Sequence, residues 1–310
     1  MDSEKLPEFH RADESIDHIE EAAGKFPGLR RAHARGNCYE GIFKPNGRAA
    51  LFTDAPHLQS EEVSVIVRFS NSSSNPNHSD GLTPPKGMAV QFALPNNQIT
   101  NLVCTTIPLF FARTPETFIE VTKLMSTAKK GLPDIKALQK IAAKFPESKA
   151  FFKMIKEIRL PASYAMAQYF SIHAFYFINE NGKRQAVKYL WEPDAGLSMY
   201  TKKEAAKLLH NYLDEELDQR LSNGPIGFNL NIQLGKENDP TDDPTVVWPG
   251  DRQQITIGHL AIHRKMDKCP EDLFFDPTVV PRGIECSEDP ILHFRHHAYA
   301  VSYDRRLKNK

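Results

Sequence analysis

The amino-acid sequence predicts an α+β fold in which an eight-stranded antiparallel β-barrel carries helical insertions and a C-terminal helix. About eight stretches have the apolar pattern of strands, and clusters of Asn, Gly, Pro and Ser separate them. Helical spacing is confined to two insertions and the two ends of the chain. No charged run or Pro/Gly linker divides the 310 residues, so we predict one domain over 1–310, with residues 1–25 as an N-terminal helical arm.

The first half of the chain begins with helical spacing and continues with strands. An amphipathic helix is predicted over residues 11–25, because Pro27 and Gly28 follow as terminators. Strands are predicted over 49–52, 63–69 and 88–94. The stretch 100–111 is apolar enough to be buried, and residues 114–160 return to helical spacing.

The second half returns to strands. Residues 170–178 and 186–191 are predicted as strands, and the sequence Asn-Glu-Asn-Gly between them favours a hairpin. Thr201 and Glu204 have the spacing of a capping box, so a helix is predicted from there to Asn223 and Gly224. Residues 226–234 and 254–262 alternate apolar with polar and complete the predicted barrel.

The composition excludes several functional classes. The 39 basic and 39 acidic residues balance, so neither nucleic acid nor an anionic membrane surface is an expected partner. No stretch approaches the roughly 18 apolar residues of a membrane span. The N-terminus has no apolar core of a signal peptide, so we predict a cytoplasmic protein, or a periplasmic one if a signal was removed.

The cysteines are few and far apart. They show no C-x-x-C spacing, so neither a zinc site nor a disulfide framework is predicted, and reduced thiols are expected. The four cysteines are Cys38, Cys104, Cys269 and Cys286.

The most unusual stretch is the last one, residues 289–306. Asp289 and Pro290 form a good helix start, and no Gly or Pro follows. Arg295, Tyr299 and Arg306 then fall on one helix face together with Ser302, where apolar residues are the usual occupants.

That face has the chemistry of a haem site. A guanidinium one turn from Tyr299 favours its phenolate, and a phenolate suits ferric haem as an axial ligand. The more distant Arg306 suits a haem propionate. The alternative is a surface helix whose arginines meet solvent.

A second cationic stretch, residues 30–36, surrounds His33. Neighbouring cations lower the pKa of an imidazole, which would keep His33 neutral and ready to act as a base, although a surface histidine is the alternative. Arg68 and Ser70 emerge at the end of the apolar strand 63–69. A guanidinium in that position needs an anionic partner, and no carboxylate lies near it in sequence.

Taken together, eight motifs in order resemble those of one family. From about residue 25 to the end, the chain is similar to the haem-dependent catalases, and more closely to the shortened catalase-related peroxidases. The resemblance implies the catalase-type barrel with a C-terminal haem-ligating helix, haem b (iron protoporphyrin IX) as cofactor, and hydrogen peroxide and a small organic electron donor as partners. It implies no NADPH, and it leaves a homo-oligomer open. The motifs are RAHARG, VRFS, PPKGMAVQF, NLVCTTIPLFFAR, SIHAF, VWPGDRQ, PRGIECSEDP and RHHAYAVSYDRR.

The resemblance also implies roles for individual residues. Tyr299 matches the axial ligand of the haem iron, and Arg295 the arginine that holds it as tyrosinate. His33 matches the distal catalytic histidine, and Ser70 the hydroxyl that orients its ring. Further matches are Arg30, Arg68 and Arg306 for the propionates, Phe118 for stacking on the haem, Phe110 and Phe111 for the approach, and His173 for the proximal side.

Three positions depart from the catalase pattern. The loop that reads G-N-N-T-P in catalases is CTTIP here, and Thr106 takes the place of the second Asn, which the resemblance makes the donor to peroxide. Pro84 replaces a channel aspartate, and Ser72 replaces a constricting valine. A second peroxide would be held less well, so we predict a haem peroxidase with weak catalase activity and with Thr106 in the catalytic set.

Two alternatives remain at this point. One is an enzyme of organic or fatty-acid hydroperoxides, similar to allene oxide synthases, although those place Thr where this chain has Ala32 and retain the Asn. The other is a non-catalytic haem-binding barrel, which would need neither His33 nor Ser70.

Overall fold

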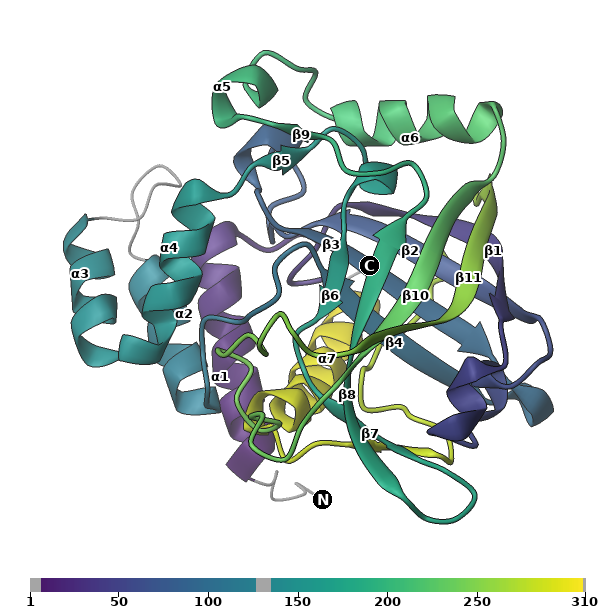
Figure 1. Cartoon of the computed structure of the whole chain (residues 1–310). Coiled ribbons are helices and arrows are strands. Elements are labelled where there is room, and N and C mark those ends of the chain that lie inside the picture. Colours follow the sequence, from purple (N-terminus) through teal and green to yellow (C-terminus); the bar gives the residue numbers. More distant parts are fainter. Residues whose placement is uncertain (1–6, 127–134, 309–310) are drawn as a thin grey trace.

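The computed structural model describes residues 7–126 and 135–308, so residues 1–6 of the predicted arm lie outside the described part of the chain. Eight antiparallel strands form a barrel that closes where β8 pairs with β10 (Figure 1). This confirms the predicted fold class. The barrel strands are β1 (Gly36–Pro45), β2 (Val63–Asn71), β3 (Lys86–Ala93), β4 (Ile99–Thr105), β6 (Tyr169–Ser171), β8 (Arg184–Pro193), β10 (Ile226–Leu234) and β11 (Gln254–Lys265).

Shorter strands extend the sheet beside β8. β7 (Phe175–Ile178) pairs with β8 and confirms the predicted hairpin, and β12 (Ile284–Cys286) pairs with β7. The single strand predicted over 170–178 is wrong, because the chain pairs with β4 and β8 only as far as Ser171 and then bends before β7. A separate pair is formed by β5 (Leu160–Pro161) and β9 (Met199–Tyr200).

The helices lie mainly on one side of the barrel. α1 (Pro7–Ala23) packs against both α7 (Pro290–Lys308) and α2 (Pro115–Ser126) (Figure 1). It ends at Ala23 because Gly24 adopts a left-handed φ of 92° and its N–H bonds to Glu20. The helical insertion is confirmed by α2, α3 (Ile135–Lys144) and α4 (Lys149–Glu157).

The second predicted insertion is shorter than expected. The capping box of Thr201 and Glu204 is present and confirms the helix start. However, α5 (Lys202–Ala205) stops after one turn, and α6 (Tyr212–Ser222) begins separately, so one continuous helix to residue 223 is wrong. The 3-10 helices are η1 (Arg48–Leu51), η2 (Pro56–Leu58), η3 (Asp80–Leu82), η4 (Pro95–Asn97), η6 (Pro146–Ser148) and η7 (Tyr164–Met166).

The first barrel strand was not predicted. β1 contains two glycines and a glutamate, which disfavour strands locally, but it pairs along its length with β2 and β11. The strand predicted over 49–52 is wrong. Those residues form η1 after Gly47, whose φ is 77°, and Leu51 is largely exposed.

Strand alternation separates the barrel interior from an outer face. Val65, Val67 and Phe69 of β2 belong to the main core, whereas Arg68 and Ser70 face outward. The outer face of β2–β4 is covered by α7, α1 and the segment 266–283 that leads from β11 to β12. The functional residues therefore lie between the barrel wall and the helices.

The prediction that all four cysteines are reduced thiols is wrong for one pair. Cys38 of β1 and Cys269 form a disulfide across 231 residues of sequence, with their Cα atoms 5.2 Å apart. The strand pairing of β1 with β11 carries the chain back to this point, and Met266 N–H donates to Cys38 O at 2.9 Å. Cys104 and Cys286 are free thiols. Within the two described ranges, no helix has both the length and the apolar character to cross a bilayer.

Candidate functional site

A cavity of about 420 Å³ lies between the outer face of β2–β4 and the helices α1 and α7. Eight of the nine residues predicted for the site line it, drawn from four separate parts of the chain. They are Arg30, His33, Arg68, Ser70, Phe118, Arg295, Tyr299 and Arg306. Ser72, Phe110 and Phe111 also line the cavity, whereas Pro85 rather than Pro84 does so in the 83–87 turn.

Helix α7 carries one wall of the cavity. Asp289 Oδ1 accepts the N–H groups of Ile291 at 2.8 Å and Leu292 at 3.3 Å, so the predicted N-cap is present. Ile291 and Leu292 are buried and fix the rotation of the helix. Arg295 then donates to the Tyr299 hydroxyl at 2.5 Å, which places a phenol oxygen and its cation together at the cavity.

The same aspartate holds a buried histidine. Asp289 Oδ2 lies 2.6 Å from Nδ1 of His173, and both side chains are almost fully buried. Desolvation lowers the pKa of His173, and the carboxylate opposes that shift. His173 was expected on this side, but Asp289 was foreseen only as a helix cap. Their 116-residue separation gives no sequence signal for the pair.

His33 lies on the opposite wall in an unusual backbone conformation. Its φ is 54°, in the left-handed region that a histidine adopts only occasionally. The Nδ1 atom lies 3.0 Å from Ser70 Oγ. Burial lowers the pKa of His33 to about 3, with a contribution from the charges of Arg68 and Arg295. The imidazole is therefore neutral at pH 7 and able to accept a proton, as the sequence suggested.

A row of residues across three strands shapes the pocket at His33. Ser70 of β2 is opposite Gly87 of β3, which is opposite Thr105 of β4. A Cβ atom on Gly87 would lie 2.8 Å from both His33 Nδ1 and Ser70 Oγ. Sequence reasoning missed Gly87, although a glycine inside a strand often marks such a close approach.

Gly87→Ala is therefore expected to destabilise the protein by about 1–3 kcal/mol, the usual cost of overpacking. Thermal unfolding measures this effect. Gly250→Ala is the matched control, because a Cβ there meets open space. Equal melting temperatures for the two variants would contradict the close approach.

Thr106 does not lie where it was expected. Its hydroxyl accepts the N–H of Lys86 at 3.0 Å, and its own N–H donates to Lys86 O. Thr105 lines the cavity instead. Side chains of adjacent residues in an extended chain point to opposite sides. Thr105 therefore faces the cavity, whereas Thr106 faces away and bonds to the backbone of Lys86.

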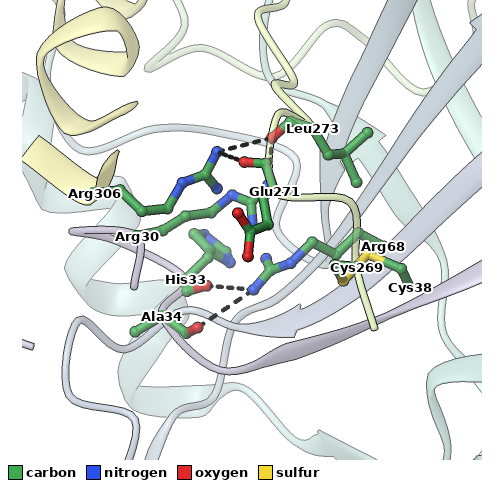
Figure 2. Close-up of a disulfide and its surroundings, with 9 residues drawn as sticks. All are labelled: Arg30, His33, Ala34, Cys38, Arg68, Cys269, Glu271, Leu273 and Arg306. Carbon is green, nitrogen blue, oxygen red and sulfur yellow. Dashed lines mark hydrogen bonds between the residues drawn. A yellow bond between two sulfur atoms is a disulfide. The ribbon is translucent and has the colours of Figure 1, made fainter. Parts of the chain in front are cut away.

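Three guanidinium groups gather at one end of the cavity (Figure 2). Arg30 donates to Leu273 O at 2.8 Å, Arg68 to His33 O at 2.9 Å, and Arg306 to the carbonyls of Glu271 and Leu273 at 3.0 and 3.2 Å. Burial and the charges of Arg68 and Arg306 lower the pKa of Arg30 to about 8.

This cluster calls for an anionic ligand. Among the residues that the structure describes, none of the three arginines forms an ion pair with a carboxylate. In the same described ranges, Nε of Arg68 and Nε of Arg306 are buried without a hydrogen-bond partner. Buried charges of one sign are stable only when a counter-charge meets them, so a ligand with carboxylate groups fits here.

Aromatic side chains form the apolar part of the cavity. Phe118 stacks on Phe110 and Phe111 at ring distances of 6.0 and 5.4 Å, and it contacts Phe294 of α7 at 5.7 Å. A flat apolar ligand with carboxylates at one edge and a metal that accepts a phenol oxygen matches all three features. The residues therefore fit haem: the arginines would hold its propionates, and Tyr299 would hold its iron.

Comparisons with known proteins agree with this geometry. The sequence pattern of the family described as catalase matches residues 15–310. A catalase-related peroxidase of Synechococcus elongatus is 33% identical over 300 residues, which cover 96% of this chain and 88% of that protein. A catalase-related peroxidase of Mycolicibacterium paratuberculosis is 34% identical over 298 residues, covering 95% and 94%.

Solved structures show the same fold. A bacterial catalase superposes on 98% of this chain with a TM-score of 0.81 at 23% identity, and the matched part is 61% of that longer protein. A fungal catalase gives the same TM-score over 94% of the chain. By its sequence match over residues 15–310 and by its barrel, this chain belongs to the catalase family.

Proposed function

We propose that this protein is a haem b-dependent peroxidase that reduces hydrogen peroxide while it oxidises a small organic donor, with weak catalase activity. The observation that carries the proposal is the pairing of two opposed walls in one cavity. One wall presents Tyr299 with Arg295, and the other presents His33 with Ser70. Two relatives named catalase-related peroxidase support the same function.

The residues of the two walls have separate tasks in this proposal. Tyr299 would hold the haem iron through its phenol oxygen, to which Arg295 donates a hydrogen bond. Arg30, Arg68 and Arg306 bind the propionates. When haem is bound, it supplies an iron that exchanges electrons with peroxide.

His33 moves the proton. Ser70 holds Nδ1, so Nε2 is the nitrogen left for the substrate. The neutral imidazole would accept a proton from one oxygen of hydrogen peroxide and donate it to the other oxygen. The left-handed backbone and the close approach of Gly87 keep the ring in this orientation.

Steady-state assays with hydrogen peroxide, with and without an aromatic donor, test the proposal. We expect donor oxidation to exceed oxygen release. Oxygen release alone would indicate a catalase, and turnover only of a fatty-acid hydroperoxide would indicate the allene oxide synthase-like alternative. A protein that binds haem without any turnover would be a non-catalytic barrel.

The ratio of catalase activity to peroxidase activity is expected to depend on Thr105. Its side chain shares a face with Gly87, next to His33, where an amide donor could hold a second peroxide. Thr105→Asn is expected to raise the ratio of oxygen release to donor oxidation about tenfold, part of the roughly hundredfold that a 1 Å misplacement costs. The gain is partial because Ser72, which lines the cavity, replaces the constricting valine that the resemblance implies.

Thr106→Asn is the matched comparison for this prediction. Its side chain bonds to the backbone of Lys86 and not to the cavity, so the ratio should stay near the wild-type value. Oxygen electrode and donor absorbance measurements on the same samples give both rates. A larger change for Thr106→Asn than for Thr105→Asn would return the role to Thr106.

A further inference from the structure

The Cys38–Cys269 disulfide lies beside the arginine cluster (Figure 2). Cys38 on β1 is directly opposite Arg68 on β2, so both side chains leave the same outer face of the barrel. Cys269 belongs to the segment 266–276, which crosses that face and contributes Phe274 and Phe275 to the cavity lining. The disulfide therefore joins the barrel wall that carries one arginine to the segment that supports the others.

The segment supports two arginines through its backbone. Leu273 O accepts from both Arg30 and Arg306, and Glu271 O accepts a second bond from Arg306. These carbonyls fix the directions of the two guanidinium groups, because each bond uses an N–H of the planar fork. A displacement of the segment would therefore move both arginines away from an anion held in the cavity.

Three hydrogen bonds and the disulfide hold the segment 266–276 to the sheet. One of these bonds runs from Asn101 Nδ2 of β4 to Asp276 O at 3.0 Å. Cys38 O accepts from Met266 N–H at 2.9 Å, and Gln91 Nε2 donates to Phe274 O at 3.2 Å. Along the chain, Cys269 lies between Met266 and Phe274, and its disulfide ties the segment to β1 covalently. Cys38 also packs with Leu273 in a small buried cluster outside the barrel. Loss of the covalent tie would thus release the segment next to the carbonyls that the arginines use.

We propose that Cys38 and Cys269 form a redox site that controls how tightly the cavity holds its carboxylate-bearing cofactor. The disulfide form holds the arginines in place, and the dithiol form releases the cofactor more readily. The substrate of the proposed function, hydrogen peroxide, closes the site, and a cellular dithiol opens it. This inference rests on the proposed function, since the ligand of the arginines is taken to be haem.

Closure is a two-electron oxidation. The Cys269 thiolate attacks one oxygen of hydrogen peroxide, the O–O bond breaks, and the sulfenic acid of Cys269 forms with release of water. The Cys38 thiolate then attacks the Cys269 sulfur, and the S–O bond breaks with release of a second water. Two thiols and one peroxide thus give one disulfide and two waters.

Reduction of the disulfide uses a different reagent, the cellular dithiol. Cys38 is buried and Cys269 is only half-buried, so a reducing thiolate meets the Cys269 sulfur first. The S–S bond then breaks, and Cys38 leaves as the thiolate at the strand position opposite Arg68. The second thiol of the reductant completes the exchange, and the reductant becomes a disulfide.

Haem transfer to excess apomyoglobin tests the proposal. Haem-loaded protein is treated with a water-soluble phosphine, which takes up the disulfide oxidising equivalents as phosphine oxide, and alkylation with mass measurement counts the thiols. We expect haem to leave the reduced protein about tenfold faster, the worth of one hydrogen bond to a charged group. Hydrogen peroxide should then restore the slow rate.

The variants separate this effect from general damage. The double variant Cys38→Ser, Cys269→Ser should release haem at the fast rate with or without phosphine. Cys286→Ser, which removes a free half-buried thiol outside the cavity lining, should behave as wild type and remain sensitive to phosphine. If the double variant does not fold, phosphine treatment of the folded wild type still decides the question.

The outcomes distinguish the inference from the proposed function. Oxidised and reduced wild type with equal release rates would overturn the redox site and leave the haem peroxidase intact. An oxidised protein that binds no haem would overturn both. Amide hydrogen exchange gives a second readout, because reduction should accelerate exchange within residues 267–273, and unchanged exchange there would also overturn the proposal.

Discussion

Tyr299→Phe is expected to reduce the haem content of the purified protein to below roughly a tenth of the wild-type value, because the oxygen proposed to bind the haem iron is lost. The variant keeps the ring and its packing but removes the oxygen to which Arg295 donates at 2.5 Å. The half-buried Arg295 guanidinium then loses its acceptor, and a buried donor left unpaired costs about 1–3 kcal/mol, which sets the upper bound here. The substitution therefore removes the proposed bond to iron and also the hydrogen bond between residues 295 and 299 of α7.

Absorbance of the ferric haem band relative to protein measures this result. Tyr303→Phe is the matched control, since it removes the same atom one turn further along α7 and should retain haem. His296 on the same helix does not compete as a ligand, because its Nδ1 lies 2.5 Å from Asp276 Oδ2. Normal haem content with an unchanged ferric spectrum in Tyr299→Phe would refute the assignment.

His33→Ala is expected to retain haem but to slow the first reaction with hydrogen peroxide by about two to four orders of magnitude, the worth of a positioned proton shuttle. Tyr299 lies on the opposite wall, and Arg68 donates to the backbone O of His33, which alanine retains, so cofactor binding is spared. Because burial lowers the pKa of His33 to about 3, the wild-type rate should also be flat between about pH 5 and pH 8.

Stopped-flow mixing with hydrogen peroxide measures both effects. His33→Asn is a second variant that guards against a backbone artefact, because asparagine tolerates the φ of 54° found at this position. Ser70→Ala should cause a smaller loss, since it frees the ring without removing the base. If both His33 variants react at close to the wild-type rate, His33 has a structural role only.

Local patterns in the sequence determined the cavity wall that α7 forms. The face shared by Arg295, Tyr299 and Arg306 follows from helical periodicity alone, and Asp289 with Pro290 defined where the helix begins. Helix geometry depends on residues three and four apart, so a correct start fixes every later face. Strand β2 was predicted equally well. Its side chains alternate between the two faces of the sheet, so Arg68 and Ser70 point away from the core.

Tertiary structure decided what depends on pairing between distant segments. The choice of Thr105 over Thr106 follows from its register with Gly87, and a shift of one residue would reverse the two faces. The disulfide of Cys38 and Cys269 exists because β1 and β11 pair, which no local pattern near either cysteine indicates.

The partners of the buried groups were also beyond the sequence. Asp289 meets His173, and Leu273 O receives two guanidinium groups, only after the barrel has closed and α7 has packed against it. Sequence chemistry showed that these arginines need an anion, because a charge that emerges from an apolar strand must be compensated. The backbone carbonyls that orient these arginines depend on the path of the segment 266–276 across the barrel. Contacts between residues 175 to 243 positions apart along the chain hold that path.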